Sequence, residues 1–170
     1  IKKVLIAGFF DRLHPGHIVF IKKATDYGSV YISLGSDDNL RKTKHREPVF
    51  NQSERKLMLK NIKGVVDVNI SKGEVGPLSF KKYLNKIKPD IFIINEDGHT
   101  KDKLEFVESR SIKYIILKRT VNNEIRKHST TELIKSVDNI PHRLDLVGFY
   151  DQIKLNKKLP GNVILANIKT

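Results

Sequence analysis

The stretch that decides the fold runs from residue 2 to residue 27 and reads KKVLIAGFFDRLHPGHIVFIKKATDY. Its first part, Lys2 to Gly8, is a short apolar run that ends in glycine, which is typical of a buried β-strand. Its last part, Gly16 to Tyr27, has Ile18 and Ile21 at helical spacing and predicts a helix. The stretch therefore predicts a strand that passes through a polar turn directly into a helix.

The same alternation continues along the chain. Apolar runs predict four further strands, at 30–35, 65–70, 91–95 and 113–117, and helical patterns predict helices at 54–62, 78–87, 101–109 and 129–137. The polar residues 37–51 predict a long loop, with Ser53 and Ser129 as caps of the helices that follow them. Because the strands are apolar without alternation, we expect both faces to be covered, as in a doubly wound, Rossmann-like parallel α/β sheet of five strands. Such sheets bind ligands beyond the carboxyl ends of their strands, which are at 8–17, 35–46, 95–99 and 117–131.

The composition limits the classes of function. The 170 residues are 39% hydrophobic and 30% charged, which is typical of a globular domain. The chain has no cysteine, which excludes disulfides, thiolate catalysis and cysteine-bound zinc. We find neither an apolar run of about 20 residues nor a signal-peptide pattern, so we expect no membrane association and a cytoplasmic location, although a segment upstream of Ile1 stays open.

The charge favours anionic partners. Lysine and arginine number 32 against 19 acidic residues, a net charge of +13. This balance is compatible with nucleic acid, an acidic membrane surface or phosphorylated metabolites as partners. A lysine-rich, solvated surface with no specific partner is the alternative.

The turn GFFDRLHPGH, residues 8–17, has the parts of a phosphate site. It opens a helix, whose first N–H groups and positive dipole end favour an anion. Gly16 allows close approach to the backbone, and His14 and His17 are three residues apart, so both imidazoles can face one space. Capping or packing histidines and a zinc pair are the alternatives, but no third zinc ligand is evident nearby.

The pattern G-x-F-D-x-x-H-x-G-H in this turn resembles the first signature of the cytidylyltransferase-like nucleotidyltransferases. The resemblance implies that His14 and His17 contact the triphosphate and stabilise the transition state. It implies further that the residues from Gly8 through Phe9 to Phe10 line the nucleotide and that Asp11 helps to order the site or the substrate.

A second signature, S-[ST]-T-x-[IL], is matched by HSTTELIK at Ser129, Thr130, Thr131 and Leu133. Ser129 as a helix cap would provide another anion site, although an ordinary cap is the alternative. The form STT-x-[IL]-I-K resembles the heptose-phosphate adenylyltransferases. The position at which many members carry a cation is Ile134 here, with Lys135 one residue later.

Other stretches add candidate residues. After the second strand the family places a lysine that reaches the phosphates; Lys42 and Lys44 are candidates, with Lys44 preferred, and solvated lysines are the alternative. Arg55 matches an arginine of the family segment E-x-R-x-x-x-L, and either lines the acceptor pocket or faces solvent. Asp97 in NEDGHTKDK matches an acid of the glycerol-3-phosphate cytidylyltransferases, but Gly98 and His99 depart from the expected tryptophan. Arg119, after the fifth strand, is a candidate nucleotide contact.

Two domains follow from this pattern. We assign residues 1–138 to the nucleotidyltransferase domain and 139–170 to a C-terminal extension. The segment PHRLDLVGFYD at 141–151 resembles the opening strand of the GHMP-type sugar kinases, without their ATP-binding loop. The extension is thus either the start of a kinase-like domain in a longer enzyme or a strand-rich segment that packs on the transferase domain or on a second subunit.

The expected function is transfer of CMP from CTP to a phosphorylated sugar or polyol, with release of pyrophosphate. Mg²⁺ would accompany the triphosphate, and no protein-bound metal is expected. The alternatives are an adenylyltransferase that uses ATP with a sugar phosphate, pantetheine phosphate or FMN, and an RNA-binding or nucleotide-sensing domain without catalysis. The absence of a tRNA-binding module and the 8% aromatic content argue against nucleic acid as a partner. Because family members are often dimers, a homodimer is a further expectation that stays open.

Overall fold

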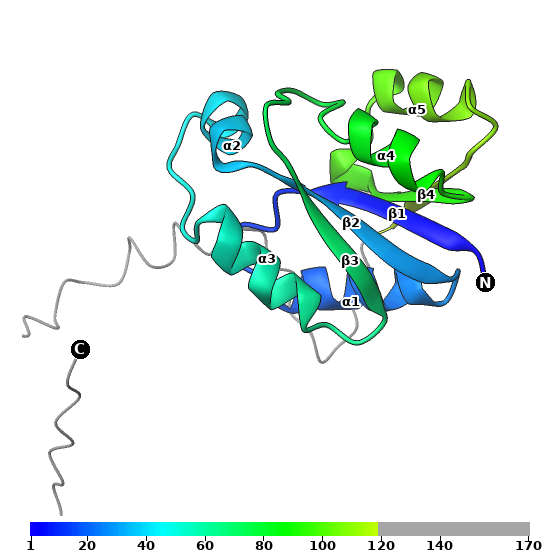
Figure 1. The fold of residues 1–170 in the computed structure, drawn as a ribbon, viewed down its shortest axis with the longest axis horizontal. Coiled ribbons are helices and arrows are strands. Elements are labelled where there is room, and N and C mark those ends of the chain that lie inside the picture. Colours follow the sequence, from blue (N-terminus) through cyan, green and yellow to red (C-terminus); the bar gives the residue numbers. More distant parts are fainter. Residues whose placement is uncertain (119–170) are drawn as a thin grey trace, which may run out of the picture. The chain divides into compact units, whose positions relative to one another are not determined.

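The chain forms one parallel five-stranded sheet, which confirms the predicted fold. The computed structural model describes residues 1–118; the predicted helix at 129–137, the boundary at 138 and the extension lie outside the described residues. The strands are β1 (Lys3–Gly8), β2 (Ser29–Gly35), β3 (Val65–Ser71), β4 (Ile91–Asn95) and β5 (Lys113–Leu117). They lie in the order β3-β2-β1-β4-β5 (Figure 1), and every pairing is parallel.

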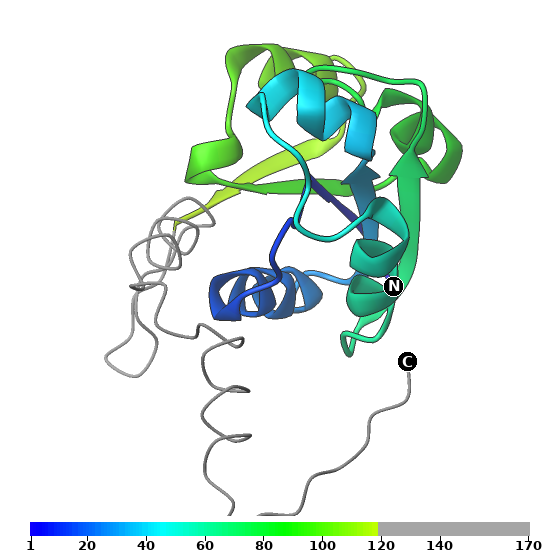
Figure 2. The ribbon, with the colours of Figure 1, turned by 90° about the vertical axis from the view of Figure 1, so that its left-hand side faces the viewer.

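Helices cover both faces of the sheet. Helices α1 (Pro15–Thr25) and α3 (Gln52–Lys60) lie on one face, and α4 (Lys81–Ile87) and α5 (Lys101–Glu108) on the other (Figure 2). Successive side chains of β1 alternate between two cores: Val4 and Ile6 pack with α1 and α3, whereas Leu5 packs with α4 and α5. All three are completely buried, which explains why β1 reads as a continuous apolar run.

The strand order reverses beside β1. From β1 the chain passes to β2 and then β3 on one side, and it returns to place β4 and β5 on the other side. Ile6 pairs with Ile32 of β2 and with Ile93 of β4, so β1 is central. The carboxyl ends of β1 and β4 therefore flank the topological switch point, where sheets of this kind bind ligands.

The predicted loop at 37–51 is wrong in its first half, which forms helix α2 (Asp37–Lys44). The Ser36 hydroxyl caps it by accepting a hydrogen bond from Asn39 N at 3.2 Å. Two aspartates lie in its first turn, and Arg41, Lys42 and Lys44 lie in its last, so the side chains complement the helix dipole at both ends. The polarity that suggested a loop is the polarity of a capped, mostly exposed helix.

Other boundaries differ by smaller amounts. Helix α3 is capped by Asn51 rather than by Ser53: the Asn51 side chain accepts from Glu54 N at 3.1 Å, and the Glu54 carboxylate accepts from Asn51 N at 2.7 Å. This reciprocal capping box outcompetes a serine two residues later. Helix α4 begins at Lys81, three residues after its predicted start. Among residues 1–118, no helix has the length and apolar character needed to cross a membrane.

Candidate active site

The motif turn lies at the switch point, between the end of β1 at Gly8 and the start of α1. His14 is the N-cap of α1, and its Nδ1 accepts a hydrogen bond from Gly16 N at 3.1 Å. An Nδ1 that accepts leaves Nε2 to carry the proton of the neutral ring. The motif therefore fixes both the orientation of this imidazole and the tautomer that its neutral form adopts.

The two motif histidines lie together, as the spacing predicted. The imidazoles of His14 and His17 are stacked, with centroids 3.8 Å apart and planes 28° apart. The ring of Phe10 packs edge-on against His17 at 5.2 Å and is itself buried. The two imidazoles and the Phe10 ring thus form one aromatic cluster at the start of α1.

The glycines of this region make room for specific rings. A Cβ on Gly16 would lie 3.0 Å from Cε1 and 3.1 Å from Nδ1 of His14, closer than ordinary contact. A Cβ on Gly35, at the end of β2, would lie 2.4 Å from the ring of Phe9. Gly16 thus permits the capping geometry of His14, and Gly35 permits the ends of β1 and β2 to pack through Phe9.

The turn is strained and is held by one carboxylate. Phe10 and Arg12 have φ angles of 48° and 57°, in the left-handed region that costs roughly 1–3 kcal/mol for a non-glycine residue. Between them, Asp11 is only 3% exposed. Its carboxylate accepts hydrogen bonds from Val49 N at 2.9 Å and Phe50 N at 3.4 Å and forms an ion pair with Arg46. These contacts join the motif turn to the segment 46–50, and the role of Asp11 toward a substrate stays a prediction.

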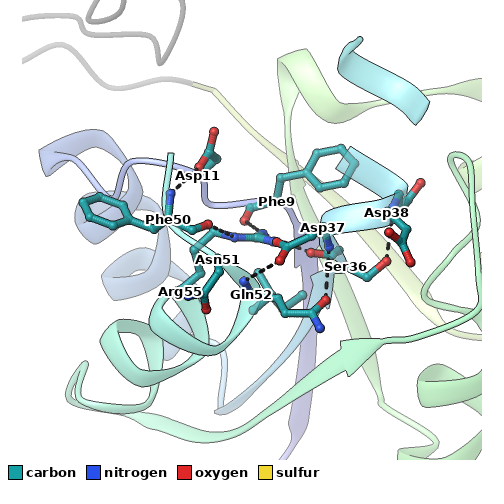
Figure 3. Close-up of polar contacts among 12 residues, drawn as sticks. Phe9, Asp11, Ser36, Asp37, Asp38, Phe50, Asn51, Gln52 and Arg55 are labelled. Carbon is teal, nitrogen blue, oxygen red and sulfur yellow. Dashed lines mark hydrogen bonds and ion pairs between the residues drawn. The ribbon is translucent and has the colours of Figure 1, made fainter. Parts of the chain in front are cut away.

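Arg55 is the centre of a second network, which Figure 3 shows in close-up. Its side chain is completely buried. The guanidinium donates to the carbonyl oxygens of Phe9, Gly35 and Phe50 and forms an ion pair with Asp37 at 2.6 Å. The alternative of a solvent-facing Arg55 is therefore wrong. The contact with an acceptor stays a prediction, and these contacts instead give Arg55 a positioning role at the ends of β1 and β2.

The two networks fix helix α2 at both ends. Asp37, its first residue, forms an ion pair with Arg55. The Asp37 carboxylate also accepts a hydrogen bond from Gln52 N, and Asp37 N donates one to the side-chain oxygen of Gln52, each at 3.1 Å. Arg46, two residues after its last, binds Asp11 of the motif turn. Both lysines are exposed, but Lys44 is four residues after the buried Leu40 and so lies on the same side of the helix, whereas Lys42 lies on another side. Of the two candidate lysines, the helix geometry favours Lys44.

Beyond β4, the 3₁₀ turn η1 (Glu96–Gly98) carries Asp97, whose side chain is exposed. Asn95 caps the turn by accepting a hydrogen bond from Gly98 N at 3.1 Å. From α5, the half-buried Lys103 donates through Nζ to the Gly98 carbonyl oxygen at 2.6 Å. Burial, followed by the nearby charge of Lys44, lowers the pKa of Lys103 below its ordinary 10.5.

The predicted site residues thus divide into three groups. The motif residues, the α2 lysines and Asp97 all lie at the carboxyl edge of the sheet. Arg55 lies beneath that edge, and the remaining candidates, Arg119, Ser129, Thr130 and Thr131, lie outside the described residues. Sequence reasoning missed Asp37, Arg46 and Lys103, because their partners are distant in sequence and no local pattern marks them.

A metal site held by the protein is not evident in residues 1–118, where no group of three histidine or acidic side chains comes together. The histidines and lysines at the carboxyl edge suit an anion better than a cation. Mg²⁺ therefore stays a prediction as an ion that accompanies the triphosphate.

Comparison with known proteins agrees with this geometry. Residues 5–141 match the profile of the family described as cytidylyltransferase-like. The FAD synthase of Methanobrevibacter ruminantium is 33% identical over 151 residues, which cover 86% of this chain and 98% of that protein. The FAD synthase of Korarchaeum cryptofilum is 31% identical over 128 residues, 73% of this chain and 79% of that protein. The bifunctional protein HldE of Helicobacter hepaticus is 34% identical over 138 residues, 80% of this chain but only 26% of that protein.

A solved structure shares the fold. The lipopolysaccharide core biosynthesis protein from Thermoplasma volcanium superposes with a TM-score of 0.61 at 23% identity, over 71% of this chain and 98% of that one. At this identity the likeness concerns the fold alone. The profile match covers most of the chain, including both predicted signatures. The chain is therefore a nucleotidyltransferase and belongs to the cytidylyltransferase-like family.

Proposed function

We propose that this protein transfers AMP from ATP to FMN and so forms FAD and pyrophosphate. The observation that carries this proposal is the similarity to two FAD synthases at 33% and 31% identity, one of them over almost its whole length. The motif turn supports it, since two stacked histidines at the start of a helix suit a phosphate-bearing substrate.

In the proposed reaction, an oxygen of the FMN phosphate attacks the α-phosphorus of ATP. A new phosphorus–oxygen bond forms while the bond from the α-phosphorus to the oxygen bridging to the β-phosphate breaks, and the electron pair leaves with pyrophosphate. A phosphate monoester has its second pKa near 6, so the attacking oxygen needs no general base at neutral pH. The protein's task is positioning and charge stabilisation, which we assign to His14, His17 and Lys44.

The expectation of CTP and a polyol phosphate has less support than its alternative. It rested on the fit to the polyol-phosphate cytidylyltransferases, and that fit fails at Gly98 and His99, where a tryptophan is expected. The FAD synthases favour ATP as the donor. A sugar phosphate with ATP is the second candidate, supported by the motif form STT-x-L-I-K and by the similarity to HldE.

The test is a matrix of donors and acceptors. Each of ATP, CTP, GTP and UTP is incubated with Mg²⁺ and with FMN, a sugar phosphate, a polyol phosphate or pantetheine phosphate. Pyrophosphate release is measured, and flavin products are separated by chromatography. Riboflavin, which lacks the attacking phosphate, is the matched control for FMN.

We expect release with ATP and FMN, stoichiometric FAD, and no release with riboflavin. A faster reaction of CTP with a polyol phosphate would restore the first expectation. Silence of the whole matrix, with ATP still bound in a thermal-shift assay, would favour a nucleotide-sensing domain. Silence together with salt-dependent RNA binding would favour the RNA-binding alternative.

A further inference from the structure

Two lysines from different helices lie at the carboxyl edge of the sheet. Lys44 ends α2, the helix that follows β2, and Lys103 lies in α5, after β4. β1, which carries the motif turn, separates these two strands. Helix α2 lies on the same side of the sheet as α4 and α5 (Figures 1 and 2), and the charge of Lys44 acts on Lys103.

This pair of positive charges is not compensated by the described part of the protein. Neither lysine forms an ion pair with a carboxylate of residues 1–118. The Lys103 ammonium has three N–H donors, and the acceptor that it contacts within this range is the Gly98 carbonyl oxygen. An ammonium that is half-buried beside a second ammonium is unfavourable unless an anion approaches both.

Other charged side chains near this edge have oppositely charged partners. Arg55 has the carboxylate of Asp37, and Asp11 has the guanidinium of Arg46. Side-chain contacts also hold helix α2 against the segment that follows β3: Asn39 of α2 donates to Ser79 Oγ at 3.0 Å and accepts from Gly76 N at 2.9 Å. Asp11 and Arg55 thus have oppositely charged partners at this edge, whereas neither Lys44 nor the half-buried Lys103 has a carboxylate partner in residues 1–118.

We propose that Lys103 donates a hydrogen bond to a phosphate oxygen of a substrate and that it forms a two-lysine phosphate site with Lys44. The inference rests on the proposed function only in that the reaction brings phosphates to this edge. The phosphate belongs either to the triphosphate of the donor or to the acceptor. Gly98 O holds the ammonium in place, and its two other N–H donors remain for the ligand.

The experiment compares Lys103→Met and Lys103→Arg with Lys101→Met in the full chain. Lys101 is the matched control, because it is an exposed lysine of the same helix that pairs with Glu105 at 3.5 Å. Calorimetry measures the affinity for inorganic tripolyphosphate, which reports the donor site whatever the base or acceptor. A second titration measures FMN against riboflavin, which reports the acceptor phosphate. Urea unfolding of each variant reports any purely structural effect.

We expect Lys103→Met to weaken one of these two affinities about 10-fold to 100-fold, as for loss of one charge-assisted hydrogen bond. Lys103→Arg should keep most of the affinity, and Lys101→Met should stay within about twofold of the unchanged protein. Whichever affinity is weakened identifies the phosphate that Lys103 binds. If Lys103→Met lowers only stability and leaves both affinities unchanged, Lys103 merely anchors η1 and the proposal is wrong. The tripolyphosphate titration still tests the proposal if FMN proves not to be the acceptor.

Discussion

Replacing Arg55 by methionine tests whether the buried guanidinium holds the site together. The substitution keeps a long apolar side chain in the space but removes the charge and its donors. Three carbonyl oxygens, of Phe9, Gly35 and Phe50, then lose a charged donor, and the Asp37 carboxylate loses its partner. Of these groups the Asp37 side chain is 16% exposed, so it regains only part of its solvation.

The magnitude follows from the burial. Breaking a buried ion pair costs about 3–5 kcal/mol, and the Arg55 side chain is 0% exposed, so solvent screening does not reduce this figure. A stability of about 5–15 kcal/mol is typical of a domain, so only at the lower end of this range does the loss bring the variant close to the limit of folding. With a urea dependence of about 2 kcal/mol per M, a loss of about 4 kcal/mol moves the unfolding midpoint by about 2 M.

Urea unfolding followed by far-UV circular dichroism measures this shift, since the chain has no tryptophan for fluorescence. The matched control is Arg41→Met: Arg41 pairs with Asp38 and Glu47, but these side chains are 45%, 80% and 75% exposed, so we expect a much smaller shift of the urea midpoint than for Arg55→Met. If Arg55→Met does not fold, Asp37→Asn removes the ion pair alone and gives a smaller loss in the same direction. Equal shifts for Arg55→Met and Arg41→Met would refute the reasoning.

Three further outcomes test the site. His17→Ala should lower turnover by roughly 10²–10⁴-fold with a smaller shift of the urea midpoint than Arg55→Met, and near-full activity would remove His17 from the reaction. Gly16→Ala should lower turnover at least about tenfold, because the new methyl group displaces the His14 ring; a crystal structure in which His14 keeps its contact with Gly16 N would contradict this reason. The pKa of Lys103 is lowered in the folded protein, so the unfolded chain binds the proton of the Lys103 ammonium more tightly than the folded chain does. Keeping this ammonium charged therefore lowers the stability of the fold at pH values below the folded pKa. The free energy of unfolding, relative to Lys103→Met, should therefore rise with pH in an alkaline window that ends near 10.5; a fall in that window would contradict the sign.

The sheet and the motif turn could be predicted because their signals are local. Continuous apolar strands such as 91–95 and the glycine-bounded turn at 8–17 carry their meaning within a few residues. The stacking of His14 on His17 likewise follows from a spacing of three at a helix start.

The networks that support the turn could not be predicted. Asp11 binds Arg46 across 35 residues, and Arg55 reaches back 46 residues to the Phe9 carbonyl. No periodicity connects such partners, and a buried arginine reads in sequence like any solvated one. Helix α2 was missed for a different reason: its apolar content is a single leucine, Leu40, so it depends on capping and on contacts such as Asn39 with Ser79 rather than on an apolar face.

The anchoring of α2 has a consequence for exchanging parts between relatives. The residues that hold this helix, Asp11, Arg46 and Arg55, lie on three separate segments of the chain. A graft of residues 36–50 from another family member would have to pair its own counterparts of Asp37 and Arg46 with the Arg55 and Asp11 of this chain. Any mismatch in these pairs would shift the helix relative to the motif turn. The smallest module that can be transferred is therefore the whole of residues 8–55. We expect chimaeras with a junction inside that span to bind nucleotide poorly, even when both parts come from natural family members.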